Sequence, residues 1–484
     1  MTAYPTEFED PGGGRRFAAN AFWMLAGPGV AKIGSFVFVL VVTRGLDATA
    51  YGQFNFAVSF VPLFLIVGTW GLDIAVIREV GRDRRRFPPL FASGLVLRVG
   101  LGVVAVAFSL LAALVLVRPG DAYLTLVLVA LALLADEVTN LGGAAFKAFE
   151  RMGWFSMALV VNRVVSTVAA IVAVASGGDI VAVAAVYLLG SLSALAVAAL
   201  VLRRSFPPVR LGDANWATVS ELLHHGAPLG LAAVLNMALF RVDAVLLQAF
   251  EGTVAVGIYG VAFRFLDSFL FVAYGLGVVA VPRIARSQWS PASERGFNAV
   301  LALMLAFYVP LAVGGLSFAP WAVRVLFGER YVEAAGAVRW LAAAGGFYAV
   351  AYLCRLSVVA LGKRHLIAVV AGGVLAGNVV GNLVAIPRYG YRGAAAMTFV
   401  SEVVEAVALA ALLVRTVGRV RLDRLVFVPL VAGSAMAVVV ALIGRSDGAG
   451  VAVGAGSYLV ALVAGALLLA PQESRRLSAF LRAR

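Results

Sequence analysis

The sequence predicts an all-α polytopic membrane protein with about 14 transmembrane helices. The chain is 62% hydrophobic and 13% charged, with a mean hydropathy of +0.97. Soluble domains are about 45–50% apolar and about 25% charged, so this composition excludes them. Its apolar runs are longer than 18 residues and do not alternate with period two. The spans are therefore expected to be helices and not barrel strands.

Taken in chain order, the apolar runs give fourteen spans. We predict them at about 18–43, 54–77, 90–117, 121–143, 156–176, 180–202, 226–249, 256–281, 297–320, 336–361, 367–387, 393–414, 425–443 and 451–470. Because the number of spans is even, both termini are expected on the same side of the membrane.

The basic residues between the spans predict the orientation. The N-terminal segment and the loops that follow even-numbered spans hold 25 Lys and Arg residues, and the opposite loops hold seven, including Arg388 and Arg392. By the positive-inside rule, both termini are cytoplasmic. We expect the protein in the cytoplasmic membrane. Tryptophans near span ends, such as Trp340, are expected to anchor at the membrane interface. The net charge of +14 lies in loops, so it sets orientation and does not indicate nucleic acid.

A faint repeat predicts two lobes. A shift of 205 residues aligns Ala50-Tyr51-Gly52 with Ala255-Val256-Gly257, Phe54 with Tyr259, and Ala57 with Ala262. We therefore expect a cytoplasmic N-terminal segment (1–17), an N-lobe (18–202), a cytoplasmic linker (203–225), a C-lobe (226–415), two further helices (416–470) and a cytoplasmic basic tail (471–484). Six spans in each unit give both lobes the same orientation, which corresponds to a parallel repeat enclosing a central cavity.

Charged residues inside the spans are the candidates for function. A charge at mid-bilayer costs at least about 2.5 kcal/mol, so such residues usually face water or a partner. Arg241 and Arg264 lie on the two spans that flank one predicted outer turn, so the two guanidinium groups could share one level of the membrane. We predict a cationic, substrate-binding cavity formed by Arg241, Arg264, Lys32, Arg98 and Arg163. The alternatives are interhelical ion pairs and arginines that snorkel to the headgroups.

Four acidic residues are candidates for ion coupling or for balancing the arginines: Asp243, Asp267, Glu402 and Glu405. Arg264 and Asp267 are three residues apart and could simply pair on one helical face. The residues alone leave coupling and charge balance equally open for Glu402 and Glu405.

Catalytic chemistry is not expected. The chain has no GxxxxGK[ST], HExxH or nucleophile-elbow motif, and no loop is longer than roughly 25 residues. It has one cysteine and three histidines with no ligand spacing, so no cofactor and no metal site are expected.

Several motifs together resemble the polysaccharide (O-antigen type) flippases of the multidrug/oligosaccharidyl-lipid/polysaccharide exporter superfamily. The resemblance covers about residues 17–415. It is carried by Asn20-Ala-Phe-Trp, Ala50-Tyr-Gly-Gln-Phe, Gly71-Leu-Asp, Gly226-Ala-Pro-Leu, Arg241-Val-Asp, Val256-Gly-Ile-Tyr, Leu326-Phe-Gly-Glu-Arg-Tyr, Ala360-Leu-Gly-Lys, Asn378 with Asn382-Leu, and Ile386-Pro-Arg-Tyr-Gly.

The resemblance implies a flippase that moves a polyprenyl-diphosphate-linked oligosaccharide from the inner to the outer leaflet by alternating access, for cell-surface polysaccharide biosynthesis. It implies a lipid-linked oligosaccharide and membrane lipid as partners, and polysaccharide polymerases or glycosyltransferases as further partners. Two alternatives remain: a drug/cation antiporter of the same superfamily, and a membrane polysaccharide polymerase or ligase.

Overall fold

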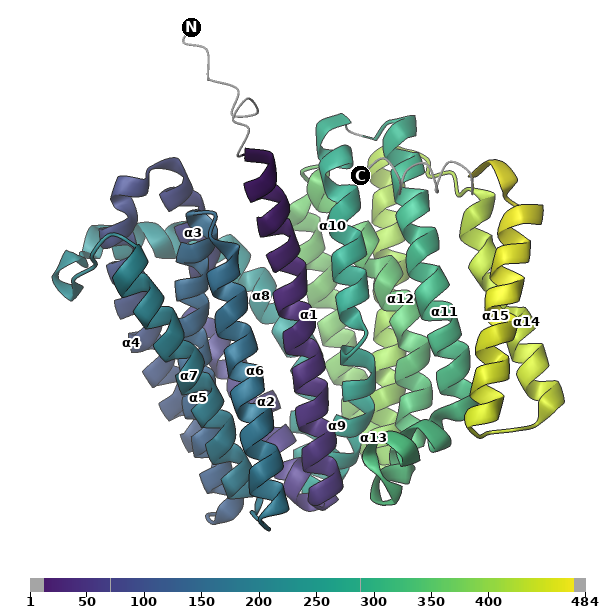
Figure 1. Ribbon diagram of the computed structural model, residues 1–484, viewed down its shortest axis with the longest axis horizontal. Helices are drawn as coiled ribbons and strands as arrows, with labels where there is room; N and C mark the ends of the chain where they lie inside the picture. Colours follow the sequence, from purple (N-terminus) through teal and green to yellow (C-terminus); the bar gives the residue numbers. More distant parts are fainter. Residues whose placement is uncertain (1–12, 70, 288, 474–484) are drawn as a thin grey trace, which may run out of the picture. The chain divides into compact units, whose positions relative to one another are not determined.

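The computed structural model describes residues 13–69, 71–287 and 289–473, and this part of the chain is helical throughout (Figure 1). The long helices are α1 (Gly13–Gly45), α2 (Ala48–Thr69), α3 (Leu72–Arg82), α4 (Phe87–Ala113), α5 (Asp121–Ala148), α6 (Met152–Ala175), α7 (Ile180–Ser205), α8 (Trp216–Phe250), α9 (Thr253–Asp267), α10 (Leu270–Ser287), α11 (Pro291–Phe327), α12 (Ala335–Ala360), α13 (Arg364–Val417), α14 (Arg424–Ile443) and α15 (Gly448–Leu468). Most of the predicted N-terminal segment and basic tail lie outside the described residues.

The described helices confirm a multi-pass membrane protein. Twelve candidate spans are long and apolar enough to cross a bilayer, and α13 is counted among them as a single span. That helix covers two of the fourteen predicted spans. The predicted seventh span lies in α8, which is 35 residues long and is not among the twelve.

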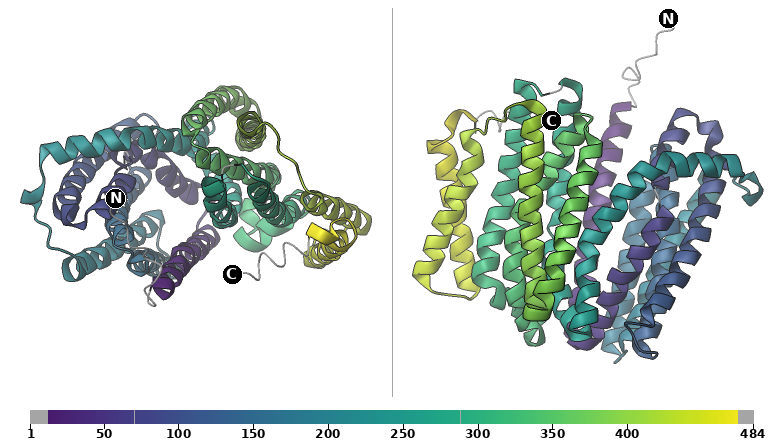
Figure 2. Two further views of the ribbon diagram at one scale, coloured as in Figure 1. Left: turned by 90° about the horizontal axis from the view of Figure 1, so that it is seen from above. Right: turned by 180° about the vertical axis from the view of Figure 1, so that it is seen from behind.

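The 54 residues of α13 form a hairpin of two antiparallel halves. Asn378 Nδ2 donates to Ser401 Oγ over 2.9 Å, although 23 residues separate them. In a straight helix these two residues would be about 35 Å apart. The chain reverses at Gly390, whose φ of 56° and ψ of −140° suit only glycine. Figure 2 shows the two halves running side by side.

Two predicted spans are not continuous helices. The predicted span 256–281 consists of α9 and α10, with a break after Asp267, and the predicted span 54–77 consists of α2 and α3. At the first break, the Tyr308 hydroxyl donates to the Phe269 carbonyl over 2.7 Å. The same carbonyl also accepts from the Val272 N–H over 3.1 Å, so the tyrosine adds a second hydrogen bond where the helix is interrupted.

Contacts divide the chain into two units, Met1–Arg241 and Val242–Arg484, with the boundary inside α8. The helix bounds of the two units repeat with the offset seen in the sequence. The ends of α1 and α8, the starts of α2 and α9, and the ends of α3 and α10 each differ by 205 residues. The connection between α7 and α8 runs from 206 to 215, so it is shorter than the predicted linker 203–225.

The last two helices, α14 and α15, pack on each other and on α11 (Figure 1). Phe318, Ala432, Met436 and Tyr458 are buried between them. The Tyr458 hydroxyl donates to the Ala306 carbonyl over 2.9 Å. These contacts make α14 and α15 part of the second unit.

Candidate functional site

The second unit contains a buried polar network centred on Asp243, which is 2% exposed. Tyr259 and Thr398 donate their hydroxyls to Asp243 Oδ2 over 2.9 and 2.8 Å. Asn382 Nδ2 donates to Asp243 Oδ1 over 2.8 Å. The carboxylate therefore joins α8 and α9 to both halves of α13.

A second layer extends the network along α13. Asn382 Nδ2 also donates to Asn378 Oδ1 over 3.0 Å, and Asn378 donates to Ser401. Asn378 and Asn382 are four residues apart, which places them on one face of the first half. Thr398, Glu402 and Glu405 are four and three residues apart, which places them on one face of the second half. The hairpin thus presents two polar stripes within otherwise apolar helices.

The network has the composition of a site for a small cation. Within the described part of the chain, no arginine or lysine forms an ion pair with Asp243. Asn382 Oδ1 is buried and has no hydrogen-bond partner. Carboxylate, amide and hydroxyl oxygens are the ligands that hard cations prefer. Among the described residues there is no cluster of three or more His, Cys, Asp or Glu, so the chemistry does not fit a transition metal.

Glu402 and Glu405 separate into two roles. Glu405 makes an ion pair with Arg355 Nη2 of α12. Glu402 is 4% exposed, and its Oε2 has no hydrogen-bond partner. Glu405 therefore balances an arginine that was not among the predicted site residues, whereas Glu402 remains a candidate for ion coupling.

Three of the basic residues predicted to line the cavity are half-buried. Arg264 Nη1 donates to Asp267 Oδ2 over 3.2 Å, so the pairing that the sequence left open is present. This pair lies at the end of α9, beside the break before α10. Arg241 on α8 and Lys32 on α1 are also half-buried. The substrate-binding role of these three residues stays a prediction.

Arg98 occupies a different environment. It is 1% exposed and lies within the first unit between α3, α4 and α5. Its Nη2 donates to Asp73 Oδ1 over 2.7 Å, and its Nη1 donates to Glu137 Oε2 over 2.8 Å and to the Glu137 carbonyl over 2.9 Å. Both terminal nitrogens are used by carboxylates. This geometry favours the interhelical ion pair over the predicted contact with substrate.

Arg163 on α6 is half-buried, and its guanidinium lies 5.7 Å from the centroid of the Tyr187 ring. The neighbouring Asn162 donates to Asp136 Oδ1 over 2.8 Å. The Arg163 side chain also forms a hydrogen bond with Tyr187 and interacts electrostatically with Asp136. Among the described residues it forms no ion pair as close as those of Arg98, and its predicted anion-binding role stays a prediction.

The first unit has aromatic residues at the positions equivalent to Asp243 and Tyr259. The 205-residue offset places Phe38 at the position of Asp243 and Phe54 at the position of Tyr259. The rings of Phe38 and Phe54 are 5.6 Å apart, and both contact Tyr187. The same helix pair is thus held by an aromatic cluster in one unit and by a hydrogen-bonded carboxylate in the other.

The sequence pointed to Asp243 but missed Tyr259, Asn382 and Thr398 as its partners. A usable signal was present, because Asn378 and Asn382 stand four residues apart in an apolar span. Amides at that spacing are expected to find partners on a neighbouring helix. Which helix supplies the partner depends on packing.

The chain shares its fold with several solved membrane transporters. The lipid II flippase MurJ in an inward closed conformation matches with a TM-score of 0.73 and 12% identity, over 90% of this chain and 97% of that chain. A multidrug resistance MATE family transporter of the MOP superfamily, inward-facing, matches with a TM-score of 0.67 and 16% identity, over 80% and 95%. A MOP superfamily transporter from Pyrococcus furiosus matches with a TM-score of 0.59 and 16% identity, over 84% and 96%.

By sequence, no curated protein matches the chain. The family model described as polysaccharide biosynthesis protein matches residues 17–288, which is more than half of the 484 residues. This match confirms the resemblance to the polysaccharide flippases at the level of family. The chain belongs to the polysaccharide biosynthesis protein family.

Proposed function

We propose that this protein is a flippase that moves a polyprenyl-diphosphate-linked oligosaccharide from the inner to the outer leaflet of the cytoplasmic membrane. Membership of the polysaccharide biosynthesis family and the fold shared with a lipid II flippase support this proposal. In this function, both termini are cytoplasmic, and polymerases or glycosyltransferases of the same glycan are partners.

The extent of the fold match favours a flippase over an antiporter. Helices α1 to α13 span residues 13–417, which is 405 of the 484 residues, or 84%. The MATE transporter above covers 80% of this chain, whereas the lipid II flippase covers 90%, about 436 residues. The chain from its first residue to the end of α13 has 417 residues, fewer than the about 436 that the flippase match covers. That match therefore includes part of the C-terminal helices. This observation carries the proposal.

The substrate poses a physical problem that charged helices address. A diphosphate and its sugars are strongly hydrated and cannot cross hydrocarbon unaided. Half-buried arginines and a lysine give such a headgroup charge-assisted hydrogen bonds. We assign this role to Arg241, Arg264, Lys32 and Arg163, with alternating access exposing them to each leaflet in turn. Arg98 is omitted because Asp73 and Glu137 occupy its terminal nitrogens.

The Asp243 network supplies a means of coupling in this proposal. A proton or monovalent cation at Asp243 would change the bonds that join α8 and α9 to both halves of α13. Movement of one charge across the membrane potential is worth about 2.3 kcal/mol per 100 mV. Asp243 and Glu402 are the coupling candidates, while Asp267 and Glu405 balance Arg264 and Arg355.

A drug/cation antiporter is the second candidate, and one observation favours it. Asp243 is a deeply buried carboxylate without a basic partner among the described residues, as a cationic substrate would require. A membrane polymerase or ligase is the third candidate. It would need an outer catalytic segment. The outer connections within the described residues are short, and the longest are residues 114–120 and 328–334, the second of which contains η3 (Glu329–Ala334).

Deletion of the gene tests the proposal directly. We expect the deletion strain to lose its surface glycan and to accumulate a lipid-linked oligosaccharide on the inner leaflet, because synthesis continues while translocation stops. Mass spectrometry of extracted lipid-linked glycans measures this accumulation. Normal surface glycan without the intermediate, in a strain lacking redundant transporters, would contradict a flippase. Loss of drug resistance with normal glycan would favour the antiporter.

Replacing Arg241 and Arg264 by Ala is expected to lower glycan export about tenfold or more at unchanged membrane abundance, because each arginine offers the diphosphate charge-assisted bonds. The single variant Asp267→Asn is the matched control. It frees Arg264 from its pair and is expected to retain most export. Full export by the double arginine variant would remove these residues from the mechanism while leaving the flippase assignment to the deletion experiment.

A further inference from the structure

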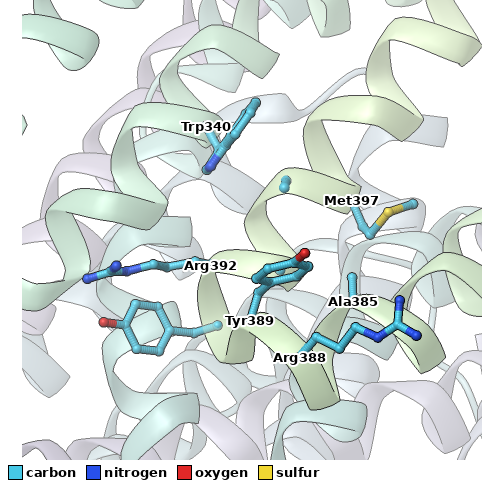
Figure 3. A pocket seen from close by; sticks show the side chains of 9 residues that line it. Trp340, Ala385, Arg388, Tyr389, Arg392 and Met397 are labelled. Atoms are coloured by element: carbon cyan, nitrogen blue, oxygen red, sulfur yellow. The ribbon is translucent and has the colours of Figure 1, made fainter.

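A cavity of about 680 Å³ lies at the turn of the α13 hairpin, within the second unit. Aromatic and basic side chains line it: Trp340 of α12, and Arg388, Tyr389, Tyr391 and Arg392 around the turn. Figure 3 shows Tyr389 in the middle of the group, with Trp340 to one side of it and the two guanidinium groups pointing away from each other. None of these residues belongs to the predicted transport site.

The basic residues of this cavity are available to an anion. Within the described residues, neither Arg388 nor Arg392 forms an ion pair with a carboxylate, in contrast to Arg324, which pairs with Glu329, and Arg445, which pairs with Asp447. The Arg392 guanidinium rests 5.9 Å from the centroid of the Tyr391 ring. Arg388 and Arg392 are both exposed, and the Arg392 side chain packs over Gly336 of α12.

Apolar surface leads away from the cavity along both halves of the hairpin. On the first half, Val380 and Val384 are exposed and stand eight and four residues before Arg388, on the same helical face. On the second half, Val400 and Val404 are exposed and follow the cavity residue Ala396 at the same spacing. A ligand whose anionic end sits in the cavity would therefore have its next atoms against apolar side chains.

The aromatic residues place this cavity at the headgroup level. Trp340 is half exposed and contacts Phe399, with 5.5 Å between ring centroids. Tyr389 is exposed, and the Tyr391 hydroxyl donates to the Glu333 carbonyl over 3.3 Å. Tryptophan and tyrosine gather where bilayer hydrocarbon meets the headgroups. The Glu251 carboxylate lies near Gly390 on the turn but is not among the lining residues.

We propose that this cavity is a binding site for the phosphate headgroup of a lipid, with Arg388 as the phosphate ligand, Tyr389 and Trp340 as the ring faces beside the headgroup, and the valine strips of α13 as the contact for the acyl or prenyl chain. The site is separate from the transport residues proposed above and does not depend on them. It accepts either an anionic phospholipid or a polyprenyl phosphate, since both present a phosphate with net negative charge above an apolar chain. The choline of phosphatidylcholine balances the charge of its phosphate, so this lipid should bind more weakly.

Fluorescence of Trp340 tests this site. Purified full-length protein in mixed micelles is titrated with phosphatidylglycerol brominated on its acyl chains, or with brominated phosphatidylcholine as the neutral lipid. The Trp340 signal is obtained by difference. For the native protein and for each variant, the fluorescence of the same protein carrying Trp340→Phe is subtracted. We expect phosphatidylglycerol to quench this signal at about tenfold lower mole fraction than phosphatidylcholine, the size of one charge-assisted bond.

The variant Arg388→Gln is expected to abolish the preference, and Arg392→Gln to reduce it. Arg445→Gln is the matched control, because it removes one exposed arginine that is already paired, and it should keep the full preference. Thermal unfolding of each variant checks that it is folded. Equal quenching by the two lipids in the native protein, or an unchanged preference in Arg388→Gln, would overturn the proposal.

Competition distinguishes the two lipid sources. If unbrominated polyprenyl phosphate relieves the quenching at lower mole fraction than unbrominated phosphatidylglycerol, the ligand is the carrier lipid. If phosphatidylglycerol competes at least as well, the ligand is bulk phospholipid. Complete relief by millimolar inorganic phosphate would mean that the apolar chain contributes nothing, and would contradict a lipid site.

Discussion

Replacing Asp243 by Asn is expected to lower glycan export at least about tenfold, because loss of a coupling ion removes a coupling free energy that is typically 1–3 kcal/mol. The substitution removes the charge and keeps the shape. The hydroxyls of Tyr259 and Thr398, which donate to Asp243 Oδ2, can instead accept from the new amide. Folding and membrane abundance should therefore change little, and export is measured as surface glycan per molecule of transporter.

Ligand-dependent stability separates coupling from structure at this position. The native protein is expected to gain thermal stability on titration with the coupling cation, tested with Na⁺ and K⁺ at constant ionic strength and with protons, because a ligand that binds only the folded state stabilises it. Asp243→Asn should lose that response. Tyr259→Phe is the matched control, since it removes one donor and keeps the carboxylate, and it should retain the response. Full export by Asp243→Asn would leave Asp243 with a structural role alone.

Replacing Arg98 by Met is expected to destabilise the first unit by about 3 kcal/mol, the low end of the cost of breaking a buried ion pair, because the carboxylate partners are partly exposed. The loss arises because the carboxyl groups of Asp73 and Glu137 lose their common hydrogen-bonded partner inside apolar helices. Thermal unfolding of the purified protein and its membrane abundance measure the effect.

A compensated variant makes the Arg98 prediction specific. Arg98→Met combined with Asp73→Asn and Glu137→Gln removes all three charges and should recover most of the lost stability. Arg324→Gln breaks an exposed pair with Glu329 and should leave thermal stability nearly unchanged, because solvent screens such a pair. If Arg98→Met left stability unchanged and reduced only export, Arg98 would be a substrate ligand, as the sequence first suggested.

The contrast between Arg98 and Arg264 shows the limit of reading charges from sequence. Both were predicted to line a cationic cavity, because each is an arginine inside an apolar run. Asp267 is three residues from Arg264, so their pairing could be foreseen from helical spacing. Asp73 and Glu137 are 25 and 39 residues from Arg98, and only the rotation of α3, α4 and α5 brings them together.

The breaks in the helices were not foreseen for a related reason. Hydropathy continues without interruption from α9 into α10, and neither a proline nor a glycine stands between Asp267 and Leu270. At the break, the Phe269 carbonyl accepts from the Val272 N–H and also from the Tyr308 hydroxyl of α11. A contact from another helix cannot be recognised from the sequence of the broken segment.

The sequence by itself determined the helical membrane class, the number of predicted spans, the 205-residue repeat and the positions of the buried charges. These depend on local composition, because burying backbone polar groups in hydrocarbon requires helices wherever long apolar runs occur. The tertiary structure decided which charges are paired, how Asp243 gains Tyr259, Asn382 and Thr398, and where the chain forms an arginine-lined cavity. These depend on contacts between helices far apart in the chain, whose rotation and depth are set by packing and not by periodicity.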